Sequence, residues 1–257
     1  MTTPEAPSPA VAEQLPPEER AAVVRSMFGS IAGRYDATNT VLSGGMHHLW
    51  RKRAIEVLAP KPDARLLDVC CGTGDLSFAL AESLQPAGAV VGTDFTPQMI
   101  DEANAKAGER ATPAAVSFQV ADAMDLPFED DTFDGATVSF GIRNVVDPRA
   151  GLAEMARVVK PGGKVLVLEF GQPGGLFGVT FRWYSRVLMP AIGGLMTGNR
   201  EAYEYLPRTS AAFPAGDLFV EQYLAPAGLV PTESIPLLWG LAWLYVGTVP
   251  EATGGDA

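Results

Sequence analysis

Short apolar runs alternate with amphipathic segments through the middle of the chain. Before this alternation begins, the pattern predicts helices over 17–34 and 46–58. It then predicts strands at 65–70, 90–94, 116–120, 135–140 and 164–170. Helices are predicted between them at 76–83, after Thr96 as N-cap, and at 148–159, where Lys160-Pro161-Gly162-Gly163 ends the helix. Strands that alternate with helices predict an α/β fold, with a parallel sheet covered on both faces.

The regular alternation ends at Gly171. Residues 171–197 are apolar but irregular, and 201–212 are partly helical with a break predicted at Pro207. A helix near 216–225 and strands near 229–236 and 241–249 complete the pattern. We expect residues 171–212, called the lid below, to lie over the edge of the sheet where the parallel strands end.

The strongest chemical signal is an apolar strand that breaks into Gly72-Thr73-Gly74 at the start of a helix. Glycines supply the backbone freedom and the space that let a turn approach a ligand. Asp94 closes the next strand about twenty residues later, which is where an acidic side chain can hold ribose hydroxyls. The sequence therefore predicts a cofactor that contains a nucleoside.

A phosphate-containing cofactor fits this turn poorly. Ser77 stands where the dinucleotide fingerprint has its third glycine, and the turn lacks the Gly-Lys-Ser/Thr of a phosphate loop. Asp68 and Asp75 flank the glycines and would repel a diphosphate, but they would attract an ammonium and a sulfonium. We therefore predict S-adenosylmethionine, with a site that includes Asp68, Gly72, Gly74 and Asp94.

Composition narrows the class of protein. The 257 residues suit one α/β domain, predicted over 18–250, with a disordered tail at 1–17 and a flexible C-terminus at 251–257. A net charge of −11 argues against sequence-independent nucleic-acid binding, which needs Lys and Arg. The two cysteines, Cys70 and Cys71, are read as small buried side chains in a reduced compartment, and no metal is predicted.

Residues 176–197 form the most apolar stretch, but Arg182, Arg186 and Pro190 interrupt it. We predict no membrane span there, because a span needs about eighteen or more uninterrupted apolar residues. Contact of 171–197 with a membrane surface stays open. The predicted location is the cytoplasm. Peripheral attachment to the inner face of the cell membrane is left open.

Several stretches together resemble one family. Residues 28–36 read Phe-Gly-Ser-Ile-Ala-Gly-Arg-Tyr-Asp, and residues 139–145 read Ser-Phe-Gly-Ile-Arg-Asn-Val. Further matches lie at 45–52, 68–75, 125–128, 157–163, 168–170 and 205–207. The chain resembles the quinol C-methyltransferases of menaquinone and ubiquinone biosynthesis, which have the class I S-adenosylmethionine-dependent fold, a Rossmann-like sheet with an antiparallel final strand.

The resemblance implies a site and a substrate. Cofactor contacts fall on Thr73, Asp94, Asp122, Ala123 and Ser139. The implied acceptor is a prenylated quinol, with demethylmenaquinol favoured and a polyprenyl benzoquinol left open. The oligomeric state is also left open, and a homodimer is one of the alternatives.

Methylation of a quinol ring carbon needs an electron-rich ring, so the phenolic proton must be removed or the phenolate stabilised. Arg143 is a candidate for phenolate stabilisation, because a guanidinium keeps its proton and is a poor base; it could instead pin a loop through a salt bridge. Asn144 can hold a hydroxyl or orient Arg143, and Tyr35 and Asp36 can orient Arg143 or close the pocket. His47 could titrate near neutrality, or have no role in proton transfer.

Two stretches depart from the family pattern. Residues 198–203 read Gly-Asn-Arg-Glu-Ala-Tyr in place of an acidic run, and residues 244–247 read Leu-Tyr-Val-Gly in place of Leu-His-Arg-Gly. They leave open a small-molecule methyltransferase of secondary metabolism. The alternative that is not an enzyme is a catalytically silent scaffold protein that binds the cofactor.

Overall fold

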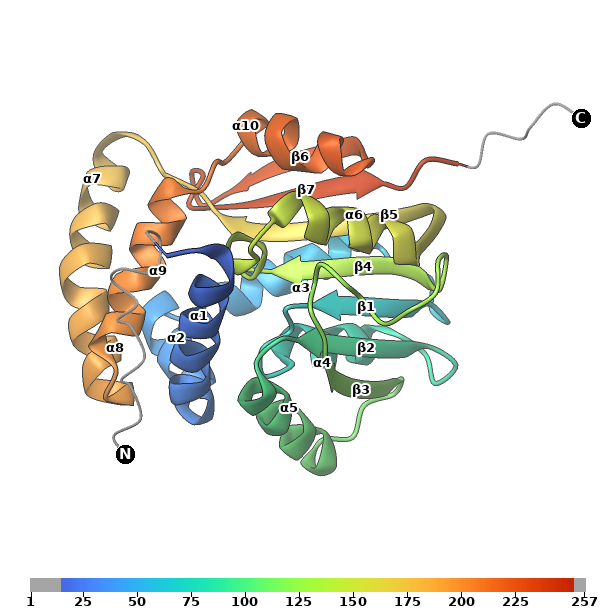
Figure 1. The fold of residues 1–257 in the computed structure, drawn as a ribbon, viewed down its shortest axis with the longest axis horizontal. Coiled ribbons are helices and arrows are strands. Elements are labelled where there is room, and N and C mark those ends of the chain that lie inside the picture. The colour runs from blue at the N-terminus through green and yellow to red at the C-terminus, as the bar shows by residue number, and fades with distance from the viewer. Residues whose placement is uncertain (1–14, 252–257) are drawn as a thin grey trace, which may run out of the picture.

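The computed structural model describes residues 15–251, and a seven-stranded sheet in the order β3-β2-β1-β4-β5-β7-β6 forms its centre (Figure 1). β1 to β5 pair in parallel, whereas β7 runs antiparallel to both β5 and β6. The predicted sheet, mostly parallel with an antiparallel final strand, is confirmed. The strands are β1 (Arg65–Val69), β2 (Ala89–Asp94), β3 (Ala115–Val120), β4 (Phe133–Ser139), β5 (Val159–Phe170), β6 (Val230–Leu237) and β7 (Ala242–Thr248).

Two apolar clusters hold helices against the sheet. Helices α3 (Met46–Leu58) and α4 (Asp75–Ser83) pack with Leu66 of β1 in one cluster. The next residue, Leu67, belongs to the other cluster, which includes α6 (Pro148–Val158) and the helical segment 217–227 that begins with α10 (Asp217–Phe219). Successive residues of a strand point to opposite faces of the sheet. Because these strands are apolar at every position, each one packs against the helices on both faces.

A third cluster lies at the end of the sheet where the parallel strands finish. Helix α1 (Pro17–Ile31) packs there against α9 (Arg200–Ala212) and Met99 of α5 (Pro97–Glu109). Helices α2 (Tyr35–Ser43), α7 (Gly175–Trp183) and α8 (Met189–Thr197) gather at the same end (Figure 1). The N-terminal helices and the lid therefore both face the edge at which ligands bind in open α/β sheets.

The lid is more regular than the sequence indicated. Residues 171–197 were expected to be irregular, but α7, a π-helical turn at Tyr184–Leu188 and α8 follow one another there. Glycine disfavours helices, but Gly193 is tolerated within α8 because its missing Cβ lets the Tyr203 ring pack directly against the helix. The break expected at Pro207 is also wrong, because α9 continues through it to Ala212.

Two further elements differ from the predicted pattern. Helix α2 was not predicted, because its Thr, Asn and Asp residues have low helix propensity. Strand β5 begins at Val159, before the Lys-Pro-Gly-Gly turn, which forms an irregularity in its pairing with β4. The predicted tail falls largely outside the described residues, although Leu15 packs against the third cluster. Of the predicted C-terminus, only Glu251 is described.

Within the described part of the chain, we find no helix with both the length and the apolar character that crossing a bilayer requires.

The divergent closing strand lies in the core. Tyr245 of β7 is 1% exposed and packs on Phe219, and its hydroxyl accepts a 2.7 Å hydrogen bond from the backbone N–H of Gly216. The side chain therefore fastens the turn before α10 to the sheet. This residue stands where the resembling family has histidine.

Tyr245→Phe should lower the free energy of unfolding by about 1–2 kcal/mol, because it leaves the buried Gly216 N–H without its acceptor. Urea unfolding of the two proteins measures the difference. An unchanged midpoint and slope would show that the hydroxyl does not fasten the turn.

Candidate functional site

Two cavities meet at the carboxyl ends of the parallel strands. The larger has a volume of about 670 Å³ and the smaller about 100 Å³. Both are lined by Tyr35, Cys70, Gly72, Ser139 and Phe140. These shared residues come from α2 and from the ends of β1 and β4, so the glycine turn lies at the junction.

The glycine turn is held by Asp94. Gly72 donates its N–H to the Asp94 carboxylate at 3.0 Å, and Thr96 donates to the other oxygen at 2.8 Å. Burial raises the pKa of Asp94 despite these bonds. Each carboxylate oxygen still has lone-pair capacity for a further hydroxyl donor. Gly74 lines neither cavity; its φ of +84° and the Phe118 ring, 2.6 Å from the place of a Cβ, explain why it is glycine.

The smaller cavity brings together most of the predicted cofactor residues. Asp122 and Ala123 line it with Asp94, and Phe95 adds an aromatic wall. The Ser139 hydroxyl is buried at the junction without a hydrogen-bond partner among the described residues. The site therefore offers carboxylates, an unpaired hydroxyl and an apolar wall within one small space.

Asp68 borders the larger cavity but is fully buried. It accepts hydrogen bonds from the hydroxyls of Ser77 (2.6 Å) and Thr137 (2.9 Å). Burial raises the pKa of Asp68 to about 6, an effect that these two bonds only partly offset. Ser77, the residue that replaces the third glycine of a dinucleotide turn, thus positions an acid.

A network of ion pairs holds α2 over the glycine turn. Asp36 accepts a hydrogen bond from the Thr73 hydroxyl and pairs with Lys106 of α5, both at 2.5 Å. Lys106 also contacts Asp75, which pairs with Arg51 at 2.8 Å. Burial opposes ionisation of Asp75, but the two cations outweigh it and hold its pKa below the usual value. Asp75 lines the larger cavity, but its charge is already compensated by these two ion pairs, so its attraction for a cationic ligand is weaker than the sequence alone indicated.

Arg143 forms a buried ion pair with Glu169 at the end of β5. The nitrogen–oxygen distance is 2.6 Å, and the two side chains are 2% and 1% exposed. The same nitrogen donates to the Phe140 carbonyl at 2.6 Å, while Arg143 Nε has no partner among the described residues. Burial raises the pKa of Glu169 even beside this guanidinium. Arg143 also lines the larger cavity, so it fixes a loop and faces the site at once.

Sequence reasoning gave Glu169 no role. The available signal was an acidic residue at the end of an otherwise apolar strand. Glu169 and the Phe140 carbonyl make the hydrogen bonds that orient Arg143; the expected partners Asn144, Tyr35 and Asp36 make none with it in the described structure.

Tyr35 and Asn144 occupy different parts of the site. Tyr35 lines both cavities, and burial raises the pKa of its hydroxyl. Asn144 lines only the smaller cavity, and its side-chain oxygen accepts a 3.3 Å hydrogen bond from the Tyr205 hydroxyl. Asp36 lines neither cavity, so it acts by fastening α2 to the turn.

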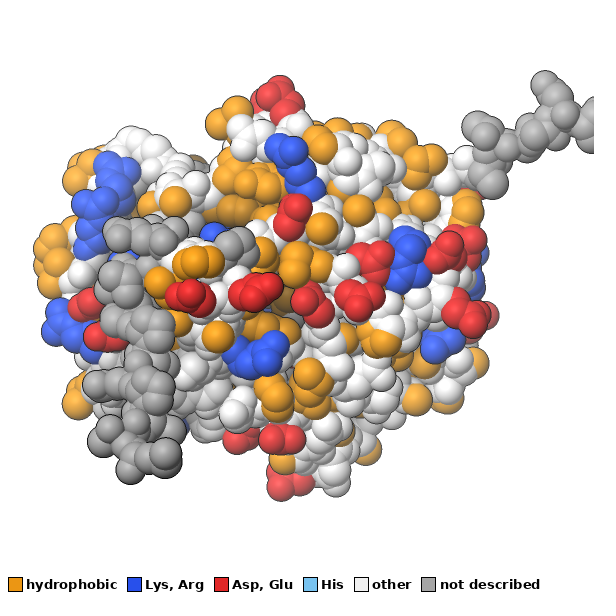
Figure 2. Space-filling view, viewed as in Figure 1, with side chains coloured by type: hydrophobic (Ala, Val, Ile, Leu, Met, Phe, Trp, Pro, Cys, Tyr) orange, Lys and Arg blue, Asp and Glu red, His pale blue; other side chains and the backbone are white. Residues whose placement is uncertain are grey.

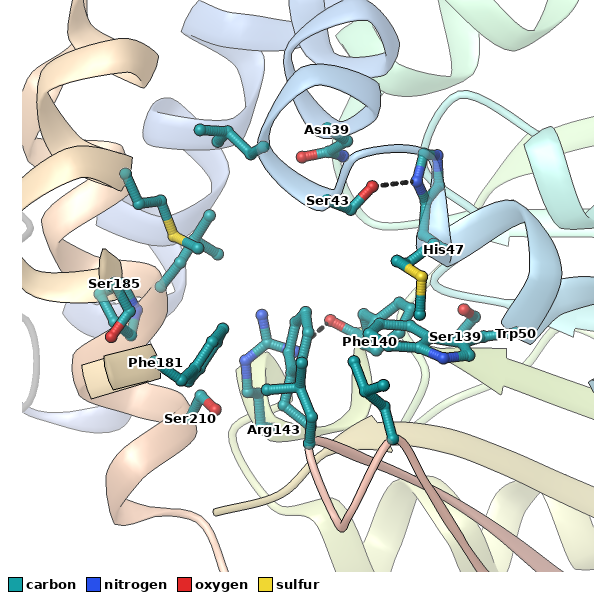
Figure 3. Close-up of a pocket in the computed structure, with 18 of the residues that line it drawn as sticks. Asn39, Ser43, His47, Trp50, Ser139, Phe140, Arg143, Phe181, Ser185 and Ser210 are labelled. Atoms are coloured by element: carbon teal, nitrogen blue, oxygen red, sulfur yellow. Dashed lines mark hydrogen bonds between the residues drawn. The ribbon is translucent and has the colours of Figure 1, made fainter. Parts of the chain in front are cut away.

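The rest of the larger cavity is mainly apolar (Figure 3). Trp50 and Phe140 lie on one side of it, and Phe181 reaches it from the lid. His47, its neighbour His48 and Asp75 could approach a metal ion, with ligand atoms within 4.8 Å of one another. Because Asp75 already pairs with Arg51 and Lys106, we assign no metal centre there.

Comparisons with known proteins agree with this geometry. The model of the ubiE/COQ5 methyltransferase family matches residues 16–248. A Bdellovibrio bacteriovorus protein named ubiquinone/menaquinone biosynthesis C-methyltransferase UbiE is 45% identical, with 88% of this chain and 96% of that protein covered. A Deinococcus radiodurans protein named demethylmenaquinone methyltransferase is 43% identical over 92% of this chain and 98% of its own.

Solved structures share the fold at lower identity. A SAM-dependent methyltransferase from Aquifex aeolicus is 16% identical with a TM-score of 0.58, and 77% of this chain and 89% of that chain are covered. The expected class I methyltransferase fold is confirmed. The match over nearly the whole domain and the identities above 40% show that this chain belongs to the ubiE/COQ5 methyltransferase family.

Proposed function

We propose that this enzyme transfers a methyl group from S-adenosylmethionine to a ring carbon of a prenylated quinol, with demethylmenaquinol as the acceptor. The observation that carries this proposal is the pair of cavities, one small with carboxylates and one large and apolar, that meet at Gly72 and Ser139. The printed names of the Bdellovibrio and Deinococcus relatives support the same reaction class.

The smaller cavity suits the nucleoside of the cofactor. Asp94 would hold the ribose hydroxyls, while Asp122 and Ala123 would border the base. The amino acid end would face Asp68 and Thr73 in the larger cavity. This arrangement would direct the sulfonium methyl toward the junction, where the two cavities share Tyr35 and Ser139.

The larger cavity suits the quinol and its tail. Arg143 would stabilise negative charge on the ionised ring, because its own charge is fixed and its Nε has no other partner in the described structure. Asn144 lines only the smaller cavity, so it would face the cofactor rather than the quinol, and Tyr35 would close the junction. A phenolate and a sulfonium neutralise each other as they react, so apolar walls do not oppose the step.

The lid carries an exposed apolar surface next to this cavity. Hydrophobic and basic side chains lie along the edge formed by α7 and α8 (Figure 2). Leu176 is 81% exposed and Trp183 59% exposed, while Arg182 and Arg186 are exposed and also line the cavity. We infer that this surface rests on an anionic bilayer, from which a prenylated substrate would enter.

Removing the Arg143 guanidinium should reduce turnover at least about a hundredfold, while cofactor affinity stays within a few-fold. The Arg143→Ala/Glu169→Gln variant avoids an uncompensated buried carboxylate. Anaerobic assays with reduced demethylmenaquinol, its quinone and a polyprenyl benzoquinol measure turnover, and calorimetry measures affinity. Equal rates with quinone and quinol, or near-wild-type turnover in the variant, would contradict the proposal.

Cofactor affinity should weaken as the pH falls through the pKa of Asp68, about 6. The unliganded protein then protonates Asp68, and its attraction for the cationic amino acid end is lost. The dissociation constant should rise about tenfold between about pH 7 and pH 5. Calorimetry on the wild type and on Asp68→Asn tests this, since the variant should bind weakly at both values. The same pH dependence in both proteins would remove Asp68 from the effect.

Leu176→Ala/Trp183→Ala should weaken binding to phosphatidylglycerol vesicles about tenfold or more, because each exposed side chain loses apolar area to bury. Co-sedimentation measures the bound fraction. Leu218→Ala/Val230→Ala removes two exposed apolar side chains outside the lid and is the matched control. Equal losses in both variants would show that the lid is not the docking surface.

A further inference from the structure

The ring carbon of a quinol can attack the sulfonium methyl group only after a phenolic hydroxyl has given up its proton, so the site must hold that proton until aromaticity returns. The following inference rests on the proposed function. Arg143 cannot take that proton. Asp75 is held in ion pairs, and Asp68 already accepts two hydroxyl donors. The site needs another acceptor.

Ser43 and His47 form a hydrogen-bonded pair on the wall of the larger cavity. Ser43 Oγ lies 2.6 Å from His47 Nδ1, and both residues line the cavity (Figure 3). The pair spans the joint between α2, which ends at Ser43, and α3, which begins at Met46. Gly44 and Gly45 make this joint with φ values of +57° and +78°, a conformation that glycine adopts without strain.

His47 is buried and uncharged in this setting. The residue is 5% exposed, and Nε2 has no partner among the described residues. Burial, followed by the neighbouring Arg51 and His48 of α3, lowers the pKa of His47 to about 4, while Asp75 of α4 acts in the opposite direction. A neutral imidazole has one nitrogen free to accept a proton. With this low pKa it is a weak base, so it can hold the phenolic proton only while Arg143 stabilises the ring anion that is left. With the proton on Nε2, Nδ1 can accept from the Ser43 hydroxyl.

The pair faces Arg143 across the cavity (Figure 3). A quinol has hydroxyl groups at opposite ends of its ring, so one can reach Ser43 while the other lies toward Arg143. Positive charge at Arg143 then lowers the energy of the ring anion across a cavity with few polar groups. One wall, with Ser43 and His47, would therefore remove the proton, and the opposite wall, with Arg143, would stabilise the resulting charge.

We propose that Ser43 and His47 act as a proton relay for the quinol. The substrate O–H bond breaks and its proton passes to Ser43 Oγ, while the serine proton passes to His47 Nδ1. The ring carbon forms its bond to the methyl group, and the electron pair of the S–CH₃ bond stays on sulfur. The methylated carbon then loses its hydrogen to water as aromaticity returns, and the relay gives the first proton back to the ring oxygen. One proton leaves overall.

Single-turnover assays with reduced quinol and bound cofactor test the relay across pH. Ser43→Ala should slow the chemical step about a hundredfold near pH 7. This deficit should shrink to less than about tenfold near pH 9.5, where a phenol with a pKa near 10 ionises without help. His47→Gln should behave in the same way, and Ser43→Thr, which keeps a hydroxyl, should stay within about threefold of the wild type. Cofactor affinity, measured by calorimetry, should be unchanged.

The matched control is Leu49→Gln, since Leu49 is 63% exposed on the same helix as His47 and lines neither cavity; its rate should equal that of the wild type at every pH. A Ser43→Ala rate near the wild-type value, or a deficit of the same size at all pH values, would overturn the relay. Failure of the proposed function is separately visible: the wild type itself would yield no methylated quinol, and the relay would be withdrawn with it.

Discussion

The ion pairs that join α2, α4 and α5 are the constraint on which the site depends. Helix α2 has little helix propensity of its own, yet it contributes Tyr35, which lines both cavities, and Ser43 at its end. Asp36 fastens the helix to Thr73 of the glycine turn and to Lys106. Partly buried charges are stable here because each has a partner. The acids near the turn therefore differ in their partners: Asp36 and Asp75 are held in ion pairs, whereas Asp68 and Asp94 border the cavities and accept hydrogen bonds from neutral groups.

The Arg143–Glu169 pair explains how a permanent cation can stand in an apolar site. A lone buried guanidinium would be costly, and Glu169 compensates its charge. One guanidinium nitrogen donates hydrogen bonds to Glu169 and to the Phe140 carbonyl, which fixes the group. Nε has no hydrogen-bond partner among the described residues and can still donate. An ionised quinol would complete this arrangement without a new buried cation having to form. The salt bridge that pins the loop would thus also present the charge that the proposed function requires.

Sequence patterns predicted the sheet because its strands are continuous apolar runs separated by turns. They also brought Gly72, Asp94 and Asp122 to one edge, since the carboxyl ends of parallel strands meet there. They failed where tertiary contacts override local preference. Helix α2 is held by charges from distant residues, and α8 tolerates Gly193 because Tyr203 packs against it. Glu169 was missed because its partner is twenty-six residues away, a pairing that no local pattern reveals.

The two departures from the family pattern affect the scaffold rather than the cavities. None of the residues 198–203 or 244–247 lines either cavity. Tyr203 packs on Gly193 between α9 and α8, and Tyr245 fastens Gly216 in the core. The larger cavity, where we propose that the acceptor binds, is instead lined by lid side chains such as Phe177, Phe181 and Leu206. Selection among quinols should therefore depend on how these lid helices pack, and the divergent strand can change without altering the wall of the proposed quinol cavity.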